Sequence, residues 1–155
     1  MANRLDTRFI ETEQYQELVD VEIIAEDYLR CNQSFTQMVF DEFVTLDKTN
    51  ASYQDKVDIK RFKMTPGNAG SWYSKTWTIP SSVTVCKVRW RTSSDFDHDI
   101  EISADNGSNW ETVSTGGAKT NMDTEITINN PGTSVILRAL NGTQGSLLGY
   151  IILVK

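Results

Sequence analysis

The chain holds few of the side chains on which catalysis usually depends. Its one histidine, His98, lies in a polar stretch, residues 93–99, and a nucleophilic enzyme would need such a base beside a serine or cysteine. A lone histidine in a loop is more often an exposed turn residue than a catalytic or metal-binding group. Paired carboxylates for glycoside hydrolysis would need a cleft and one raised pKa, and no pattern in the sequence indicates either. We therefore predict no enzymatic activity and no cofactor.

Three acids, Asp95, Asp97 and Asp99, alternate along the same stretch. On an extended strand they would share one face, and three clustered oxygen donors could bind Ca²⁺. The alternative is a solvated strand edge whose charges discourage pairing with another sheet. The alternative is favoured, so no metal site is predicted.

An aromatic segment, residues 71–79, offers a different chemistry. Trp72, Tyr73 and Trp77 could stack against a sugar ring, whose apolar C–H faces lie well on aromatic faces. In a straight strand Tyr73 and Trp77 share one side and Trp72 takes the other, so core packing accounts for at least one side. These three residues are the candidate glycan-binding residues.

The two cysteines, Cys31 and Cys86, are too few for a disulfide framework or a zinc site. Cys86 falls in an expected strand, where we interpret it as a small buried apolar residue. A disulfide between Cys31 and Cys86 is geometrically possible. No export signal supports it, because the first residues lack the apolar run of a signal peptide.

Length and composition limit the class of protein. A chain of 155 residues with 39% hydrophobic and 23% charged residues is typical of one globular domain, with or without an extension. The longest apolar run, residues 147–154, is too short to span a bilayer. We therefore expect no membrane partner.

Charge is unevenly placed along the chain. Residues 1–30 hold eight acids and three arginines, which accounts for most of the net charge of −6. An acidic balance argues against binding nucleic acid, which needs Lys and Arg to neutralise phosphates. Lys87, Arg89 and Arg91 form a local basic cluster on one strand face, interpreted as a solvated face or a protein contact.

From Phe35 onward the pattern is that of β-strands. Turn residues interrupt the strand-forming segments. Examples are residues 65–70, Pro80 with Ser81 and Ser82, and residues 129–132. Strands that recur every 8–15 residues with such turns between them predict an all-β sandwich or jelly roll. The expected strands are 37–46, 57–64, 71–79, 83–92, 99–103, 110–113, 125–128, 134–140 and 147–154. In 83–92 the predicted core side is Cys86, Val88 and Trp90.

The turn at residues 103–110 is the strongest local signal. Asn106-Gly107 favours a tight hairpin, because both residues tolerate positive φ. The segment resembles the Asp-box motif, Ser-x-Asp-x-Gly-x-Thr-Trp, with Asn109 in place of the Thr. The resemblance implies that Asp105 ties down backbone N–H groups of the turn and that Trp110 anchors it on the core.

Residues 38–155 as a whole resemble the small jelly-roll modules common in bacteriophage virion proteins, which are related in layout to galactose-binding and discoidin-like domains. The segments that carry this resemblance are 40–43, 71–75, 100–113, 135–140 and 149–154. It implies an antiparallel jelly-roll β-sandwich at 38–155 and a place in the virion.

Residues 1–37 differ from the rest and match no family. Leu18, Val21, Ala25 and Tyr28 have helical spacing, whereas residues 17–24 also alternate as a strand would, so both readings stay open. The segment has too few apolar residues for a core of its own. We interpret it as an N-terminal docking arm on its own sandwich or on a neighbouring subunit. The predicted partner-binding residues are Phe9, Ile10, Leu18, Val21 and Ile23.

Together these patterns predict a non-enzymatic structural protein of a phage virion, most simply a tail, neck or fibre-associated component. Its expected partners are other virion proteins and further copies of itself in a homo-oligomer. The alternative functions are a carbohydrate-binding module for host surface glycans and a capsid decoration protein.

Overall fold

The computed structural model describes residues 29–30, 32, 34–116 and 122–155. Almost all regular structure in them is β-strand, as the alternating sequence predicted. The elements are β1 (Gln37–Asp41), the 3-10 helix η2 (Ala51–Lys56), β2 (Val57–Asp58), β3 (Lys63–Met64), β4 (Trp72–Tyr73), β5 (Trp77–Thr92), β6 (Asp99–Ser103), β7 (Glu111–Ser114), β8 (Met122–Leu140) and β9 (Leu147–Val154). Within these residues, no helix is long or apolar enough to cross a membrane.

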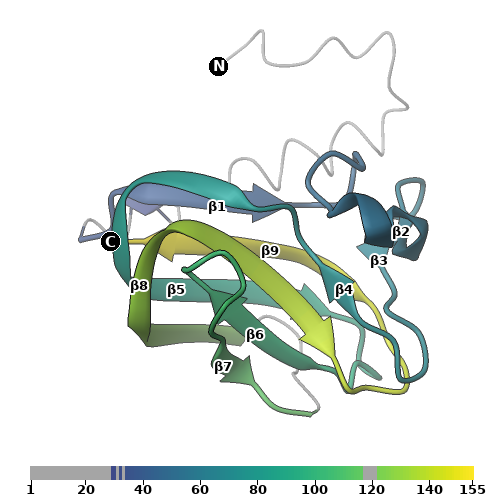
Figure 1. Ribbon diagram of the computed structural model, residues 1–155. Helices are drawn as coiled ribbons and strands as arrows, with labels where there is room; N and C mark the ends of the chain where they lie inside the picture. The colour runs from purple at the N-terminus through teal and green to yellow at the C-terminus, as the bar shows by residue number, and fades with distance from the viewer. Residues whose placement is uncertain (1–28, 31, 33, 117–121) are drawn as a thin grey trace, which may run out of the picture.

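The strands form two layers packed face to face (Figure 1). The back layer consists, in order, of β1, β9, β5 and the first half of β8. The front layer consists, in order, of β4, the second half of β8, β6 and β7. The β2–β3 hairpin extends the back layer at the start of β9, and all described strand pairs are antiparallel. The predicted all-β antiparallel jelly-roll β-sandwich is thus confirmed.

β5 and β8 run through both layers. Trp77 of β5 pairs with Val135 in the front layer, and after register shifts between residues 78 and 85 the two strands continue together in the back layer as far as Trp90 and Met122. The prediction that Pro80 and residues 129–132 end the strands is therefore wrong. At the corner of a sandwich a strand can change sheets through a bulge, where proline and glycine are tolerated.

Two other predicted strands are shorter than expected. The run 37–46 ends at Asp41, because the chain turns at Phe43, whose φ is +57°. The run 57–64 splits into β2 and β3 around a four-residue turn, in which Phe62 has φ +49°. Periodicity alone does not distinguish one alternating strand from a very short hairpin.

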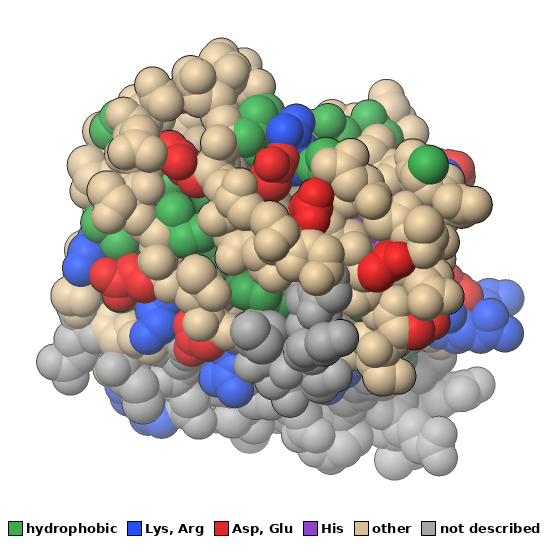
Figure 2. Space-filling view, turned by 90° about the horizontal axis from the view of Figure 1, so that it is seen from below, with side chains coloured by type: hydrophobic (Ala, Val, Ile, Leu, Met, Phe, Trp, Pro, Cys, Tyr) green, Lys and Arg blue, Asp and Glu red, His purple; other side chains and the backbone are tan. Residues whose placement is uncertain are grey.

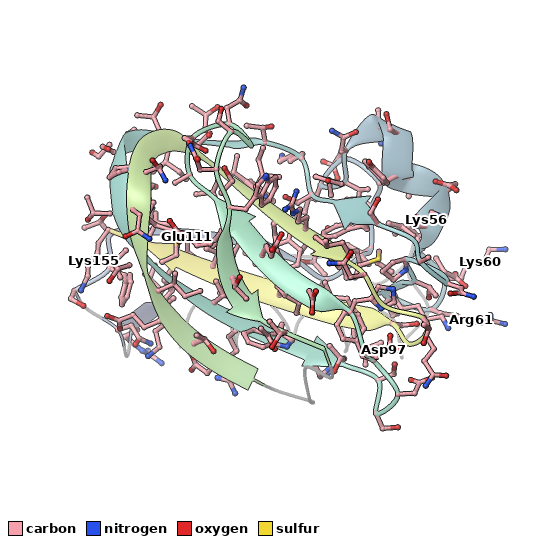
Figure 3. The ribbon with its side chains drawn as sticks, turned by 60° about the horizontal axis from the view of Figure 1, so that its bottom comes forward. Lys56, Lys60, Arg61, Asp97, Glu111 and Lys155 are labelled. Carbon is pink, nitrogen blue, oxygen red and sulfur yellow. The ribbon has the colours of Figure 1, made fainter. Side chains whose placement is uncertain are left out.

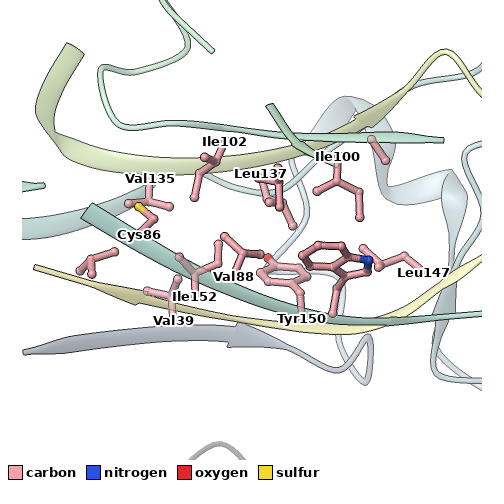
Figure 4. Packing of buried hydrophobic residues seen from close by; sticks show 14 of the residues in the cluster. Val39, Cys86, Val88, Ile100, Ile102, Val135, Leu137, Leu147, Tyr150 and Ile152 are labelled. Atoms are coloured by element: carbon pink, nitrogen blue, oxygen red, sulfur yellow. The ribbon is translucent and has the colours of Figure 1, made fainter. Parts of the chain in front are cut away.

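The main core fills the space between the layers, as Figure 4 shows. Cys86, Val88 and Trp90 point into it, which confirms the predicted core side of β5. The largest fully buried side chains include Trp72, Trp90, Phe43, Phe96 and Met64. The rings of Phe43 and Trp72 meet edge to face with centroids 5.7 Å apart, a favourable arrangement for aromatic packing.

Candidate ligand-binding face

One row of polar and aromatic residues crosses the outer side of the front layer. Arg138 of β8 pairs with Tyr73 of β4 on one side and with Glu101 of β6 on the other. Directly paired residues point to the same side of a sheet. The neighbouring row, which contains Trp72, is buried in the main core. The row centred on Arg138 therefore faces away from the core.

Aromatic rings surround this row. The rings of Tyr53 and Tyr73 stack with centroids 4.9 Å apart and an interplanar angle of 29°. Trp110 meets Tyr73 edge to face at 5.8 Å. All three residues are half-buried. We call Tyr53, Tyr73, Glu101, Trp110 and Arg138 the Arg138 face.

Arg138 joins the charged and aromatic parts of the Arg138 face. Its Nε and Nη2 lie 2.6 Å and 2.5 Å from the same carboxylate oxygen of Glu101. Its guanidinium carbon lies 3.8 Å from the ring centroid of Trp110, and Nη1 donates to the Tyr73 hydroxyl at 3.4 Å. A planar guanidinium can hold an ion pair in its plane while it stacks on a ring, which lysine cannot do. Arg138 is thereby held in one position.

The turn between β6 and β7 positions Trp110. Asp105 Oδ1 accepts from the backbone N–H of Asn109 at 2.9 Å, and Oδ2 accepts from the Asn109 side chain at 2.6 Å. These hydrogen bonds lower the pKa of Asp105 below its usual range. Ser103 Oγ accepts from the N–H of Gly107, whose φ is +84°, and the Trp110 indole donates to the Gly107 carbonyl at 3.0 Å.

The β6–β7 hairpin forms where the sequence predicted it. Asp105 also ties down a backbone N–H of the turn, a contact that the resemblance of residues 103–110 implied. Trp110 differs from expectation, because it does not enter the main core and lies half-buried on the Arg138 face. The turn therefore presents the tryptophan at the outer surface of the front layer.

The predicted glycan-binding residues Trp72, Tyr73 and Trp77 do not form one platform. Trp72 is 0% exposed, and its indole donates to Thr49 Oγ1 inside the protein, so no ligand can reach it. Trp77 pairs with the buried Val135 and packs against the main core. The sequence predicts that Tyr73 and Trp77 share one side of a single strand, but the strand is interrupted between the end of β4 and the start of β5, so they do not. Tyr73 alone lies on the Arg138 face.

His98 is fully buried, so its interpretation as an exposed turn residue is wrong. Its Nε2 lies 3.2 Å from the Gly67 carbonyl, and its Nδ1 lies 3.4 Å from Asp97 Oδ1. Its ring also packs against Phe96 at 5.1 Å between centroids. The contacts place His98 in a structural position beneath the loops at one end of the sandwich.

Two of the alternating acids, Asp97 and Asp99, fasten loops to strands. The Thr143 hydroxyl and the backbone N–H groups of Gln144 and Thr143 donate hydrogen bonds to Asp97, and these lower its pKa to about 2. Asp99 accepts from the N–H of Gly116 at 2.6 Å. Among the described residues, no group of three or more His, Cys, Asp or Glu side chains could hold a metal ion.

Glu111 fastens the bend of β8 to the other end of the β6–β7 hairpin. It accepts from the backbone and the side chain of Asn129, at the bend of β8. Figure 3 shows Asp97 and Glu111 far apart at opposite ends of β6 and β7. These carboxylates do not converge, so they do not form the pair that glycoside hydrolysis requires.

A buried carboxyl group lies at the end of β1. Asp41 is 1% exposed, and burial raises its pKa to about 7 although the N–H of Phe43 donates to its Oδ1 at 2.8 Å. It lies in the same row as Tyr150, whose pKa burial and the Asp41 charge also raise. This pair lies inside the sandwich, away from the Arg138 face.

Sequence reasoning missed four of the five residues of the Arg138 face. Alternation in 134–140 places Arg138 opposite the core residues Leu137 and Ala139, and this signal was available. Trp110 follows directly from the predicted turn. Tyr53 gives no such signal, because only the fold brings η2 against β4.

Cys31 lies outside the described residues. The predicted partner-binding residues also lie outside them, namely Phe9, Ile10, Leu18, Val21 and Ile23.

The surface seen from below is of mixed character (Figure 2). Acidic and basic side chains are interspersed there, and the hydrophobic side chains of the described residues form small separate areas. Where the described residues form this face, it is therefore polar and not broadly apolar.

No family model matches the sequence, and no curated protein matches it. Solved structures with a similar chain path include the C-terminal CBM6 of LamC, a laminarinase from Zobellia galactanivorans, with 15% identity and a TM-score of 0.45, covering 76% of this chain and 99% of that one. Another is chitosan-binding module 1 of a chitosanase/glucanase from Paenibacillus sp. IK-5, with 18% identity and a TM-score of 0.39, covering 75% and 92%. At such TM-scores the likeness carries no argument about function.

Proposed function

We propose that this protein is a non-enzymatic binding module whose ligand is a carbohydrate and whose binding surface is the Arg138 face. The observation that carries the proposal is the contact between Arg138 and Trp110 beside the Glu101 carboxylate, at the outer surface of the front layer. The same surface thus offers aromatic area and charged hydrogen-bonding groups within one row of the sheet.

The chemistry of this surface suits a sugar ring. A pyranose has apolar C–H faces that stack on an aromatic ring and hydroxyls that hydrogen-bond at its edge. Trp110 and Tyr73 supply the rings. The second carboxylate oxygen of Glu101 can accept a charge-assisted hydrogen bond from a sugar hydroxyl. A purely apolar ligand would leave the Arg138–Glu101 pair desolvated, which is costly.

Rigidity supports the proposal as well. Arg138 is held by three partners, and Trp110 is held by its hydrogen bond to Gly107. Side chains that are already fixed lose little conformational entropy when a ligand binds. Such a surface can bind a small part of a glycan without rearrangement.

Titration calorimetry against a set of soluble oligosaccharides, chosen from a glycan array, tests the proposal. We expect Trp110→Ala to weaken binding by about tenfold or more, equivalent to about 1.4 kcal/mol, and Trp110→Phe to weaken it less because a ring is kept. Ile59→Ala is the control, since Ile59 is 43% exposed and lies in the β2–β3 turn. Binding of no glycan by the intact protein, or equal affinity of the Trp110→Ala variant, contradicts the proposal.

A role in a phage particle stays a prediction from the sequence. It concerns where the module is displayed, whereas the Arg138 face concerns what the module contacts. A glycan-binding sandwich at the tip of a fibre would satisfy both.

A further inference from the structure

The outer side of the back layer carries a small second core. In β9, Tyr150, Ile152 and Val154 point into the main core, so Ile151 and Leu153 point outward. Outward residues of a two-layer sandwich normally meet solvent. Ile151 is nevertheless only 7% exposed and Leu153 is 0% exposed. The described residues that pack with them are Phe35, Leu29, Met38, Phe40 and Val85.

A row of cations runs beside this second core. Lys87, Arg89 and Arg91 of β5 pair with Leu153, Ile151 and Gly149 of β9, in that order. Because paired residues share a side of the sheet, the three cations lie on the same outer side as the apolar strip. We call these cations together with Ile151, Leu153, Met38 and Phe40 the basic–apolar face.

The chain approaches β1 across this face. Asn32 Oδ1 accepts from Lys87 Nζ at 2.8 Å, so the segment begins over β5. Phe35 then packs with Leu153 of β9, and Thr36 N–H donates to the Val154 carbonyl at 3.1 Å. Leu29 belongs to the same apolar cluster. The described chain therefore starts on top of the basic–apolar face.

The 28 residues before Leu29 have the complementary composition. They contain eight acids against two arginines, and they also hold the apolar residues Leu18, Val21 and Ile23. The outer side carries three cations on β5 and apolar residues on β9 and β1, and Glu125 and Asp123 of β8 lie beside Lys87 and Arg89 on the far edge of the cations. An acidic segment with apolar residues therefore complements the part of the face formed by β5, β9 and β1.

We propose that residues 1–28 cover the basic–apolar face of their own chain, with carboxylates near Lys87, Arg89 and Arg91 and apolar side chains against Ile151 and Phe40. The covalent connection supports the same chain as the occupant rather than a second copy. Since Leu29 already lies on the face, no linker has to be spanned and the effective concentration of the segment is high.

Paramagnetic broadening in NMR spectra of the full-length protein tests this proposal. A spin label is attached to a Gln16→Cys, Cys31→Ser variant, in which the native Cys86 is buried and has a pKa raised to about 12 by burial, so it does not react. We expect loss of amide signal in β1, β9 and β5 that exceeds the loss in β4 and β6. Loss confined to β4 and β6, or none in either layer, overturns the proposal.

A mixed sample identifies the occupant. Isotope-labelled protein without a spin label is combined with spin-labelled protein that is isotopically silent. We expect no broadening in this sample. Broadening of β9 and β5 there overturns the proposal, because a second copy would then supply the segment.

A charge reversal tests the basic part of the face. In an Arg89→Glu, Arg91→Glu variant of the spin-labelled protein we expect the broadening of β5 and β9 to be lost. Lys60→Glu, Arg61→Glu is the matched control, with the same change in charge in the β2–β3 turn, where Figure 3 shows both side chains projecting outward. Equal broadening in both variants overturns the proposal.

Discussion

The guanidinium carbon of Arg138 lies 3.8 Å from the ring centroid of Trp110, although the two residues come from different elements. Arg138 lies near the end of β8, and Trp110 ends the turn that leads into β7. The contact therefore depends on the hairpin turn having one particular shape. The first prediction concerns that shape.

Gly107→Ala should destabilise the protein and displace Trp110. The φ of +84° at Gly107 is costly for any residue with a Cβ, by about 1 kcal/mol. A Cβ there would lie 3.6 Å from the Trp110 ring, which is an ordinary contact, so the cost arises from the backbone of the turn that holds Trp110. Urea denaturation measures the loss of stability, and tryptophan fluorescence reports the change around Trp110. Gly116→Ala is the control, since Gly116 has no positive φ and its Cβ would come no closer than 3.8 Å to another atom; equal effects of both substitutions would contradict this account.

Trp72→Ala should act on stability. Trp72 is fully buried between the layers, and truncation of a buried tryptophan costs about 3–5 kcal/mol. Trp110→Ala should cost clearly less, because Trp110 is only half-buried. Chemical denaturation of both variants checks the order. The opposite order would place Trp110 and not Trp72 in the core.

Asp41 should make the protein less stable as the pH rises. Its pKa in the folded protein is about 7, against 3.8 for the unfolded chain, so the folded state holds the proton more tightly. The resulting stability is complete below pH 4 and is lost as the pH rises to 7, by roughly 4 kcal/mol as an upper bound.

The Asp41→Asn variant checks this pH dependence. The amide keeps an oxygen that can accept the hydrogen bond from Phe43, and it cannot ionise. Denaturation curves between pH 4 and pH 8 should show a flatter profile than the parent protein. Asp55→Asn, at an exposed site in η2, should leave the parent profile unchanged. A parent-like slope in the Asp41→Asn variant would refute the assignment.

Asp97→Ala should loosen the loop between β8 and β9. Asp97 accepts from the backbone of Thr143 and Gln144, and its pKa of about 2 shows that the folded protein favours the ionised form. This contribution is present above the unfolded pKa of 3.8 and is lost as the pH falls toward 2. Hydrogen exchange of the two amides should accelerate in the variant. Asp95→Ala, at an exposed position, should leave both amides protected.

Strand positions and the fold class could be predicted because alternation and turn residues are local signals. The inward side of β5, with Cys86, Val88 and Trp90, follows from alternation alone. The failure at Pro80 has a physical cause. A proline that ends most strands is tolerated at the corner where β5 passes between layers, and only the three-dimensional arrangement creates that corner.

The Arg138 face was harder to predict, because its residues come from five separate segments. Local pattern places Tyr73 and Arg138 on outward positions, but their pairing across β4 and β8 is a long-range property. His98 illustrates the reverse error. Its polar neighbours suggest exposure, whereas loops from distant parts of the chain, including Gly67, cover it.

The position of β9 bears on how the protein is made. β9 follows every other described strand in the sequence, yet it lies between β1 and β5 and pairs with both. During synthesis on the ribosome, β1 and β5 must therefore wait, with their edges unsatisfied, until residues 147–154 emerge. The pairing that joins β1 to β5 is therefore completed only by the last strand of the sandwich.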